Sequence, residues 1–463
     1  MTLARRLMRV VSSRTHAQTM SRADSRIMTI SAPRAASALP GGSHGAWSAD
    51  LRLLLGDEAE GPLRALIETA DGELLSFRPR QVTHQPHRGT GASSTIVQYG
   101  AQVRWGGGQT AKETLVMATG GRIPPKAAVL ESDGVRVGIW RWPFDPDLPG
   151  LASAVDAGAV NALLADLGMG GGTVQLTVRA YRPGRRAVIE ASGTHGRVFL
   201  KVVRPHRVEP LNAKHRLLAK HLPVPHSYGY AAEGILALQA LHGGSLRSAL
   251  AGAAAPLPTA AELEGLLDRL PTELSGSQPS GDHLGRAEHY ADVVAGCLPE
   301  ERARLDELVG RYAALDAGEH PLVAVHGDFY EGQILVDRGR VSGLLDVDTA
   351  GTGHRIDEWA TMLAHLCVLG LLHPKARRIK RYGADMLAAV EQRYPARQLR
   401  SRISAAVLGL ATGPFRVLLP RWPEQTRRRI GLAEEWLTGA EENARNATTS
   451  ANAGHEDSLT AVS

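Results

Sequence analysis

The chain has 463 residues, of which 43% are hydrophobic, so it is long and apolar enough to form two or three packed units. Its formal net charge of +6 would suit nucleic acid, but zinc-finger spacing, an aromatic-rich basic sheet and a helix crowded with Arg and Lys are all missing, so we expect no nucleic-acid binding. Cys297 and Cys367 are the only cysteines and no apolar run reaches membrane-spanning length, which predicts a cytoplasmic protein without a disulfide framework and without a membrane anchor.

Both ends of the chain are predicted to lack a packed structure. Residues 1–45 contain seven Arg and one acid, a composition that resembles a transit peptide. Because no apolar stripe is sustained there, we favour a mis-called start, with Met20 or Met28 as the true beginning, or plain disorder. Residues 440–463 are small and polar, which predicts a disordered tail.

Three regions are expected between these ends. Residues 46–150 are predicted to form a β-rich cap, with strands at 63–68, 94–104 and 115–119 and a turn-rich segment, 142–150, that closes it. Residues 151–242 are predicted to form a small lobe, with helices at 151–167 and 211–221, a hairpin over 174–203 and two more strands. Helices dominate the pattern from 243 to 439, apart from one short β segment around 322–349.

That β segment gathers polar residues of a kind that handles phosphate. An apolar run ends at His326-Gly327-Asp328, Gln333 follows five residues after Asp328, and a second short strand ends at Asp346. Folding the two strands about their turn brings Asp328, Gln333 and Asp346 to the same end. Phosphoryl transfer needs one carboxylate at the attacking hydroxyl and others on Mg²⁺, and acids this close repel one another without a cation.

The arrangement resembles the catalytic and metal-binding loops of aminoglycoside phosphotransferases, in the protein-kinase-like superfamily that includes choline kinases and maltokinases. The resemblance implies an α+β, bilobal protein-kinase-like fold with a small β-rich N-lobe and a mostly helical C-lobe, preceded here by the additional β-rich cap. It implies that Asp328 is the catalytic base and Asp346 the principal Mg²⁺ ligand. Gln333 stands where the family usually has an Asn metal ligand, and Asp348 either assists the metal or caps the following turn.

Two further residues near this motif are expected to support it. His326 precedes Asp328 and is interpreted as ordering the loop by hydrogen bonding rather than as an acid–base group. Asp357 matches a family position at the start of a helix, where we expect it to cap amides and brace the catalytic loop.

The nucleotide is expected to bind through the small lobe. Only seven residues are Lys, and one of them, Lys201, lies in an apolar strand, which favours a role on the nucleotide phosphates. The turn with Gly184 and Arg186 occupies the place of the nucleotide-covering loop, although it is equally well read as an ordinary turn. Gln239 and Leu241 are expected at the adenine hinge. The usual helical Glu partner of the Lys is missing, which leaves His215 or Glu209 as candidates.

The sequence therefore predicts an enzyme that uses ATP (or GTP) and Mg²⁺ to move the γ-phosphoryl group to a hydroxyl of a small molecule. An aminoglycoside, a sugar or another polyol would serve as acceptor. Acids that could bind a cationic acceptor lie between 262 and 288, namely Glu262, Glu264, Asp268, Glu273, Asp282 and Glu288, although solvated faces explain them equally well. The stretch 275–281 reads as a lid or a linker. The alternative is a pseudokinase, a nucleotide-binding scaffold without turnover. The sequence gives no indication of the oligomeric state.

Overall fold

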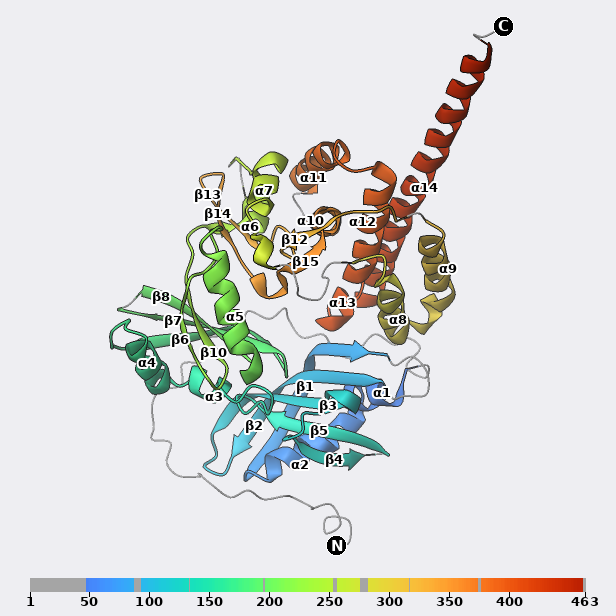
Figure 1. Cartoon of the computed structure of the whole chain (residues 1–463). Coiled ribbons are helices and arrows are strands. Elements are labelled where there is room, and N and C mark those ends of the chain that lie inside the picture. The colour runs from blue at the N-terminus through green and yellow to red at the C-terminus, as the bar shows by residue number, and fades with distance from the viewer. Residues whose placement is uncertain are drawn as a thin grey trace. The chain divides into compact units, whose positions relative to one another are not determined.

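The computed structural model describes residues 47–86, 93–132, 134–194, 196–252, 256–274, 282–315, 317–373 and 376–460 (Figure 1). The predicted start 1–45 and the predicted lid or linker 275–281 lie outside these residues. The chain divides into two compact units. The first extends to Gly196 and includes Lys201–Arg204; the second holds Arg197–Leu200 and everything from Pro205 onward.

The first unit begins with two helices and a five-stranded antiparallel sheet. The helices are α1 (Ala49–Leu55) and α2 (Glu60–Glu68), which contact strands of the sheet through buried leucines such as Leu54 and Leu63. The sheet has the order β1-β2-β3-β5-β4, with β1 (Gly72–Gln85), β2 (Ser94–Trp105), β3 (Thr110–Thr119), β4 (Ala128–Ser132) and β5 (Val135–Arg141). The additional N-terminal sheet predicted from the sequence is thus present.

Helix α2 corrects the prediction of a strand at 63–68. Leu63 and Ile67 are both buried and are four residues apart, which is the spacing of one helical face. The window 63–68 is too short to separate that period from strand alternation, and only the preceding turn from Glu60, with Pro62 near its start, makes the helix evident.

The elements from residue 151 follow the predicted order with altered boundaries. The single expected helix 151–167 is two helices, α3 (Leu151–Ala154) and α4 (Ala157–Asp166), because the Asp156 carboxylate accepts the Ala159 amide at 2.8 Å and so caps a new helix. The hairpin region forms β6 (Val174–Arg182), β7 (Arg186–Gly193) and β8 (Gly196–Val203). Helix α5 (Pro205–Leu218) starts earlier than predicted, and β9 (Ser227–Ala231) and β10 (Ile235–Gln239) follow it. These strands have the order β6-β7-β8-β10-β9.

The second unit continues as a mainly helical region with two small sheets. The sheets have the orders β11-β13-β14 and β12-β15. Their strands are β11 (Gly244–Ser245), β12 (Leu322–Val325), β13 (Ile334–Asp337), β14 (Arg340–Leu344) and β15 (Gly351–His354). The helices are α6 (Leu246–Ala251), α7 (Ala260–Leu267), α8 (Ala287–Cys297), α9 (Arg302–Ala313), α10 (Arg355–Leu372), α11 (Ala376–Glu391), α12 (Ala396–Leu410), α13 (Gly413–Arg416) and α14 (Trp422–Thr460). Short 3-10 turns lie at Asp57–Ala59, Gly120–Arg122, Thr272–Leu274, Pro299–Glu301 and Val347–Thr349.

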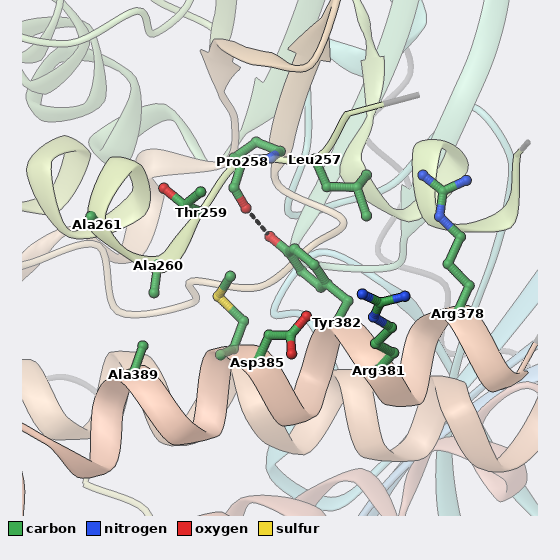
Figure 2. A pocket seen from close by; sticks show the side chains of 11 residues that line it. Leu257, Pro258, Thr259, Ala260, Ala261, Arg378, Arg381, Tyr382, Asp385 and Ala389 are labelled. Atoms are coloured by element: carbon green, nitrogen blue, oxygen red, sulfur yellow. Dashed lines mark hydrogen bonds between the residues drawn. The ribbon is translucent and has the colours of Figure 1, made fainter. Parts of the chain in front are cut away.

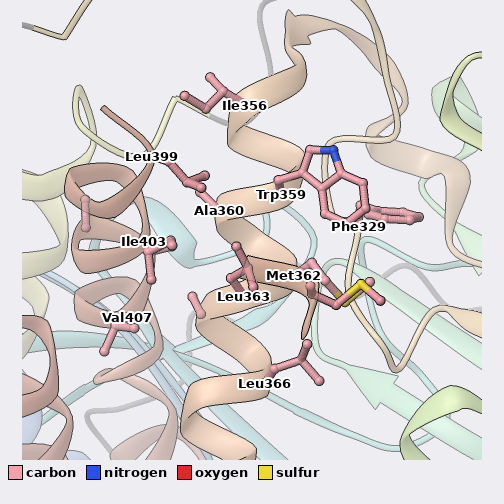
Figure 3. Packing of buried hydrophobic residues seen from close by; sticks show 14 of the residues in the cluster. Phe329, Ile356, Trp359, Ala360, Met362, Leu363, Leu366, Leu399, Ile403 and Val407 are labelled. Atoms are coloured by element: carbon pink, nitrogen blue, oxygen red, sulfur yellow. The ribbon is translucent and has the colours of Figure 1, made fainter. Parts of the chain in front are cut away.

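Helix α10 is the centre of the second unit's core. Its residues are buried on most sides, and Figure 3 shows Ala360 and Leu363 directed toward Ile403 and Val407 of α12. Phe329, the residue after Asp328, is fully buried and makes an edge contact with Trp359 of α10. The loop that carries Asp328 is therefore anchored in the core by the residue next to this acid.

Helix α14 continues to Thr460 and so includes most of the segment 440–463, for which a disordered tail was predicted. The Ala and Glu content of that segment favours a helix, and the polar composition alone did not indicate it. None of the helices within the described ranges combines the length and the hydropathy needed to cross a membrane. The predicted domain boundaries at 150, 242 and 439 stay predictions.

Candidate active site

The loop that carries Asp328 is held by a buried carboxylate from α10. The two oxygens of Glu358 accept the backbone amides of His326 and Gly327 at 2.7 and 2.8 Å, and Glu358 is only 2% exposed. Burial raises the pKa of Glu358, while the hydrogen bonds from the two amides act in the opposite direction. The bracing role that the sequence suggested for Asp357 thus belongs to its neighbour. Asp357 pairs instead with Arg402 of α12 at 3.4 Å and makes no cap to α10.

His326 joins the two acid-bearing loops. Its Nε2 lies 2.8 Å from the Leu345 carbonyl, and its Nδ1 lies 3.3 Å from the Asp328 amide. A backbone amide can only donate, so Nδ1 accepts and the proton is on Nε2, which donates to Leu345. The ring is completely buried. This geometry suits the predicted ordering role, because both ring nitrogens already have main-chain partners.

Asp328, Gln333 and Asp346 lie close together at one end of the hairpin, as predicted from the sequence. Gln333 directly precedes β13 and Asp346 follows β14. The Gln333 side-chain nitrogen lies 3.3 Å from Asp328 Oδ2 and 3.4 Å from Asp346 Oδ2. It also lies 3.2 Å from the hydroxyl of Tyr330. One amide group thus spans both carboxylates.

The backbone of Asp346 adopts an uncommon conformation. Its φ and ψ angles are 55° and 50°, in the left-handed region that a residue with a Cβ enters only at a cost of roughly 1–2 kcal/mol. The preceding residue is fixed on both sides, since the Leu345 amide donates to the Gln333 carbonyl at 2.8 Å and the Leu345 carbonyl accepts from His326. Strain of this kind is typical of functional turns.

Lys214 of α5 holds the turn that follows Asp346. Its ammonium donates to the main-chain carbonyls of Asp348 and Ala350 at 2.9 and 2.7 Å. Asp348 itself lies in the turn Val347–Thr349 and contributes its carbonyl to this contact. Sequence reasoning did not single out Lys214, although the scarcity of Lys in the chain was an available signal.

The predicted nucleotide residues lie on the expected elements. In the first unit, Lys201 is on β8 and 6% exposed, Gly184 forms the turn between β6 and β7 with a φ of +65°, and Arg186 begins β7. In the second unit, Gln239 ends β10, where its amide donates to the His226 carbonyl at 2.9 Å, and Leu241 follows.

The two candidate partners of Lys201 lie on the same helix. Both His215 and Glu209 lie on α5, and the His215 ring is 1% exposed with Nδ1 at 2.9 Å from the Pro225 carbonyl. The ring therefore serves to attach α5 to the segment before β9.

Comparison with known proteins gives a family for this region. Residues 177–394 match the model of a family described as the phosphotransferase enzyme family, APH. That region of the chain belongs to the phosphotransferase family. The match spans Lys201 and the whole stretch from His326 to Asp357, so it confirms the resemblance drawn from those motifs, and the α+β kinase-like fold expected from it is confirmed as well.

Solved structures of phosphotransferases resemble the chain only distantly. A thermostable mutant of aminoglycoside phosphotransferase APH(4)-Ia is 15% identical, with a TM-score of 0.40, over 61% of this chain and 98% of that one. Macrolide 2'-phosphotransferase MphH from Brachybacterium faecium is 18% identical, with a TM-score of 0.38, over 61% and 97%. The aminoglycoside-3'-phosphotransferase of type VIII is 20% identical, with a TM-score of 0.35, over 51% and 92%. No curated protein sequence matches the chain.

The oxygen donors of the phosphotransferase region fit a magnesium ion that is shared with a nucleotide. Among the described residues no group of three or more His, Cys, Asp and Glu side chains is arranged to hold a metal alone. Asp328 and Asp346 offer two carboxylates, and Gln333 places its amide nitrogen against both of them. Mg²⁺ in phosphotransfer sites commonly takes one or two carboxylates, with phosphates and water completing its six ligands, so this donor set is sufficient.

A second group of side chains contacts Gln333 through Tyr330 and was not identified from the sequence. The Tyr330 ring stacks on His365 with centroids 4.0 Å apart, and the carboxylate of Glu331, next to Tyr330, pairs with Arg247 at 2.7 Å. Burial raises the pKa of Tyr330 to about 12 and lowers that of His365 to about 3. Tyr330 therefore stays protonated and His365 neutral near pH 7, which makes the stack a fixed support for the Gln333 amide.

A pocket of about 690 Å³ opens elsewhere in the second unit. Figure 2 shows it between the start of α7 and α11, where the Tyr382 hydroxyl donates to the Pro258 carbonyl at 2.7 Å. Its lining includes Arg378, Arg381 and Asp385 but none of the predicted site residues. This pocket is therefore separate from the acid-bearing loops.

Proposed function

We propose that the protein is an ATP-dependent, Mg²⁺-requiring phosphotransferase that moves the γ-phosphoryl group to a hydroxyl of a small molecule in the cytoplasm. The observation that carries this proposal is the meeting of Asp328, Gln333 and Asp346 at one amide nitrogen, with contacts of 3.3 and 3.4 Å. The membership of residues 177–394 in a phosphotransferase family supports it.

Each residue has a role that its position suits. Asp328 accepts or orients the proton of the acceptor hydroxyl, since it is the carboxylate of the loop that His326 and Glu358 fix. Asp346 would hold Mg²⁺, and Gln333 would join it through Oε1 when its amide turns over, since its nitrogen now faces the two carboxylates. The ion, when bound, neutralises charge on the phosphates. Asp348 would either assist the metal or cap the turn that follows it.

The remaining predicted residues would bind the nucleotide. Lys201 binds the α- and β-phosphates, and the turn with Gly184 and Arg186 covers them. The backbone near Gln239 and Leu241 receives the base, which leaves ATP and GTP both acceptable.

The acids around residues 262–288 favour a neutral acceptor over a polycationic one. Glu262 caps α7 through Thr259, and Glu264 accepts the Trp359 indole at 2.6 Å. Asp268 lies 3.8 Å from Arg355, and Asp282 accepts the Gly285 amide at 2.8 Å. These four acids thus have structural partners. A sugar or another polyol is therefore better supported as the acceptor than an aminoglycoside.

The test is ATP consumption over a panel of sugars, polyols and aminoglycosides, with product detected by mass. We expect Mg²⁺-dependent phosphorylation of a neutral hydroxylated compound, and its loss in Asp346→Asn. Consumption with aminoglycosides alone would keep the reaction class and overturn the acceptor class.

A pseudokinase is the second candidate, and one observation favours it. The Gln333 nitrogen donates to both Asp328 and Asp346, so the carboxylates are bridged by an uncharged group. Thermal-shift measurements with ATP, with and without Mg²⁺, separate the two functions. ATP binding without consumption over the whole panel would favour the scaffold.

A further inference from the structure

The turn between β6 and β7 is held at both of its main-chain groups. The Gly184 amide donates to Asp145 Oδ2 at 2.8 Å, and the Gly184 carbonyl accepts from Arg204 Nε at 3.0 Å. Gly184 has a φ of +65°, and a Cβ at this position would lie 3.3 Å from Asp147 Oδ2. The tip of the hairpin is therefore fixed by residues outside the hairpin, in a conformation that suits glycine.

The carboxylate that holds the turn is deeply buried. Asp145 is 2% exposed, and besides Gly184 it accepts the Tyr181 hydroxyl at 2.8 Å and the Asp147 amide at 3.0 Å. The Tyr181 hydroxyl also accepts the Trp140 indole at 3.1 Å. Hydrogen bonds to a charged acceptor are strong when they are shielded from water, so this group restrains the hairpin firmly.

Arg204 connects the same segment to the strand that carries Lys201. It directly follows β8, three residues after Lys201, and its guanidinium donates to Asp147 Oδ2 at 2.7 Å as well as to the Gly184 carbonyl. The hairpin turn, the end of β8 and residues 145–147 thus form one hydrogen-bonded group, all within the first unit.

We infer that the turn-rich segment 142–150, at the end of the N-terminal β-rich region, is a positioning device for nucleotide binding. This segment fixes the position of the hairpin turn at Gly184 relative to the strand that carries Lys201. Both are therefore in place before the nucleotide phosphates bind. The inference rests on the proposed function and gives the region 46–150 a role. Asp145, Asp147 and Arg204 are positioning residues, since they contact the hairpin turn and the end of β8.

The restraint itself is tested without any nucleotide, by hydrogen exchange. We expect the Gly184 amide to exchange at least about tenfold faster in Asp145→Asn, because a charged hydrogen bond is lost. Arg204→Gln is the safer variant, since its side chain is 44% exposed and we expect its loss to leave folding intact. Asp166→Asn, at an exposed acid of the same unit, is the matched control. Unchanged exchange in both test variants would overturn the restraint.

The effect on the nucleotide is tested by calorimetric titration with ATP·Mg²⁺ and with adenosine. In Arg204→Gln we expect the Kd for ATP to rise about tenfold while the Kd for adenosine stays the same, because the turn would act on the phosphates. Equal weakening of both ligands would indicate general structural damage and overturn the positioning role, as would unchanged ATP binding. If the wild-type protein binds no ATP, the proposed function fails with this inference, whereas the exchange result still judges the restraint.

Discussion

At the scale of single residues, we expect the chemistry of this site to depend strongly on Asp328. It is the one carboxylate that belongs to the His-Gly-Asp loop, and its amide, its neighbours and its side chain all have defined contacts. Its removal should therefore affect chemistry more than folding. Removal of Asp357, which lies 29 residues further along and pairs with a buried arginine, should instead affect folding more than chemistry.

Asp328→Asn should reduce phosphoryl transfer by at least about 100-fold, the scale of general-base catalysis. The thermal midpoint should change little, because an amide of the same shape can still contact Gln333. Initial rates with the best acceptor of the panel measure the effect. Asp337→Asn, at an exposed acid ending β13, is the control and should keep full activity. Turnover within tenfold of wild type in Asp328→Asn would remove the residue from the mechanism.

Asp357 should make stability depend on pH. Burial, partly opposed by Arg402, raises its pKa to about 7, so between about pH 4 and 7 the folded state keeps a proton that the unfolded chain has lost. The free energy of unfolding contributed by this group therefore falls by about 1.4 kcal/mol per pH unit as pH rises from about 5 to 7, and is flat above 7.

Chemical denaturation at several pH values measures this dependence, with Asp357→Asn as the reference. The stability of wild type relative to the variant should decline between pH 5 and 7. A constant difference over that range would show that Asp357 is already ionised at pH 5.

At the scale of elements, the acid-bearing loops are connected to two helices. Glu358 joins the Asp328 loop to α10, and Lys214 joins the turn after Asp346 to α5. Since Asp346 has left-handed backbone angles, the turn needs such support to keep its carboxylate in place. The position of α5 and the geometry of Asp346, the proposed metal ligand, are thereby coupled.

Lys214→Met tests this coupling, because it keeps the aliphatic stem and removes two hydrogen bonds from a charged donor. We expect the Mg²⁺ concentration for half-maximal activity to rise about tenfold, with a small change in thermal midpoint. Lys214→Arg should restore part of the affinity. Lys220→Met, at an exposed lysine just beyond α5, should behave as wild type. The same Mg²⁺ requirement in both methionine variants would contradict the idea.

For the whole molecule, nucleotide binding should appear as stability. A ligand that binds only the folded chain raises the free energy of unfolding by about 2.7 kcal/mol at 100 times its Kd. ATP with Mg²⁺ should raise the thermal midpoint more than ATP with a chelator, because the ion offsets the repulsion between the acids and the phosphates. In Asp346→Asn the additional effect of Mg²⁺ should disappear. An equal shift with and without the ion would argue against a metal at this site.

The sequence alone determined the acid-bearing hairpin and the fold class. Asp328, Gln333 and Asp346 lie within nineteen residues, so one tight turn between two short strands brings them together wherever the hairpin packs. Their spacing could therefore be read directly. The structure of the short window 63–68 could not be read in this way, because a spacing of four residues fits one face of a helix and also one face of a strand. Burial against the sheet decided in favour of α2.

Tertiary structure decided which groups support that hairpin. The Glu358 contact joins residues 32 apart, the Gly184 contact residues 39 apart, and the Lys214 contact residues 134 apart. A carboxylate or an ammonium has no preferred partner at such separations in a sequence. It obtains one only when packing removes both groups from water, since a buried charge without a partner is costly. For this physical reason the spacing of residues predicted the chemistry, whereas only the fold revealed what holds it in place.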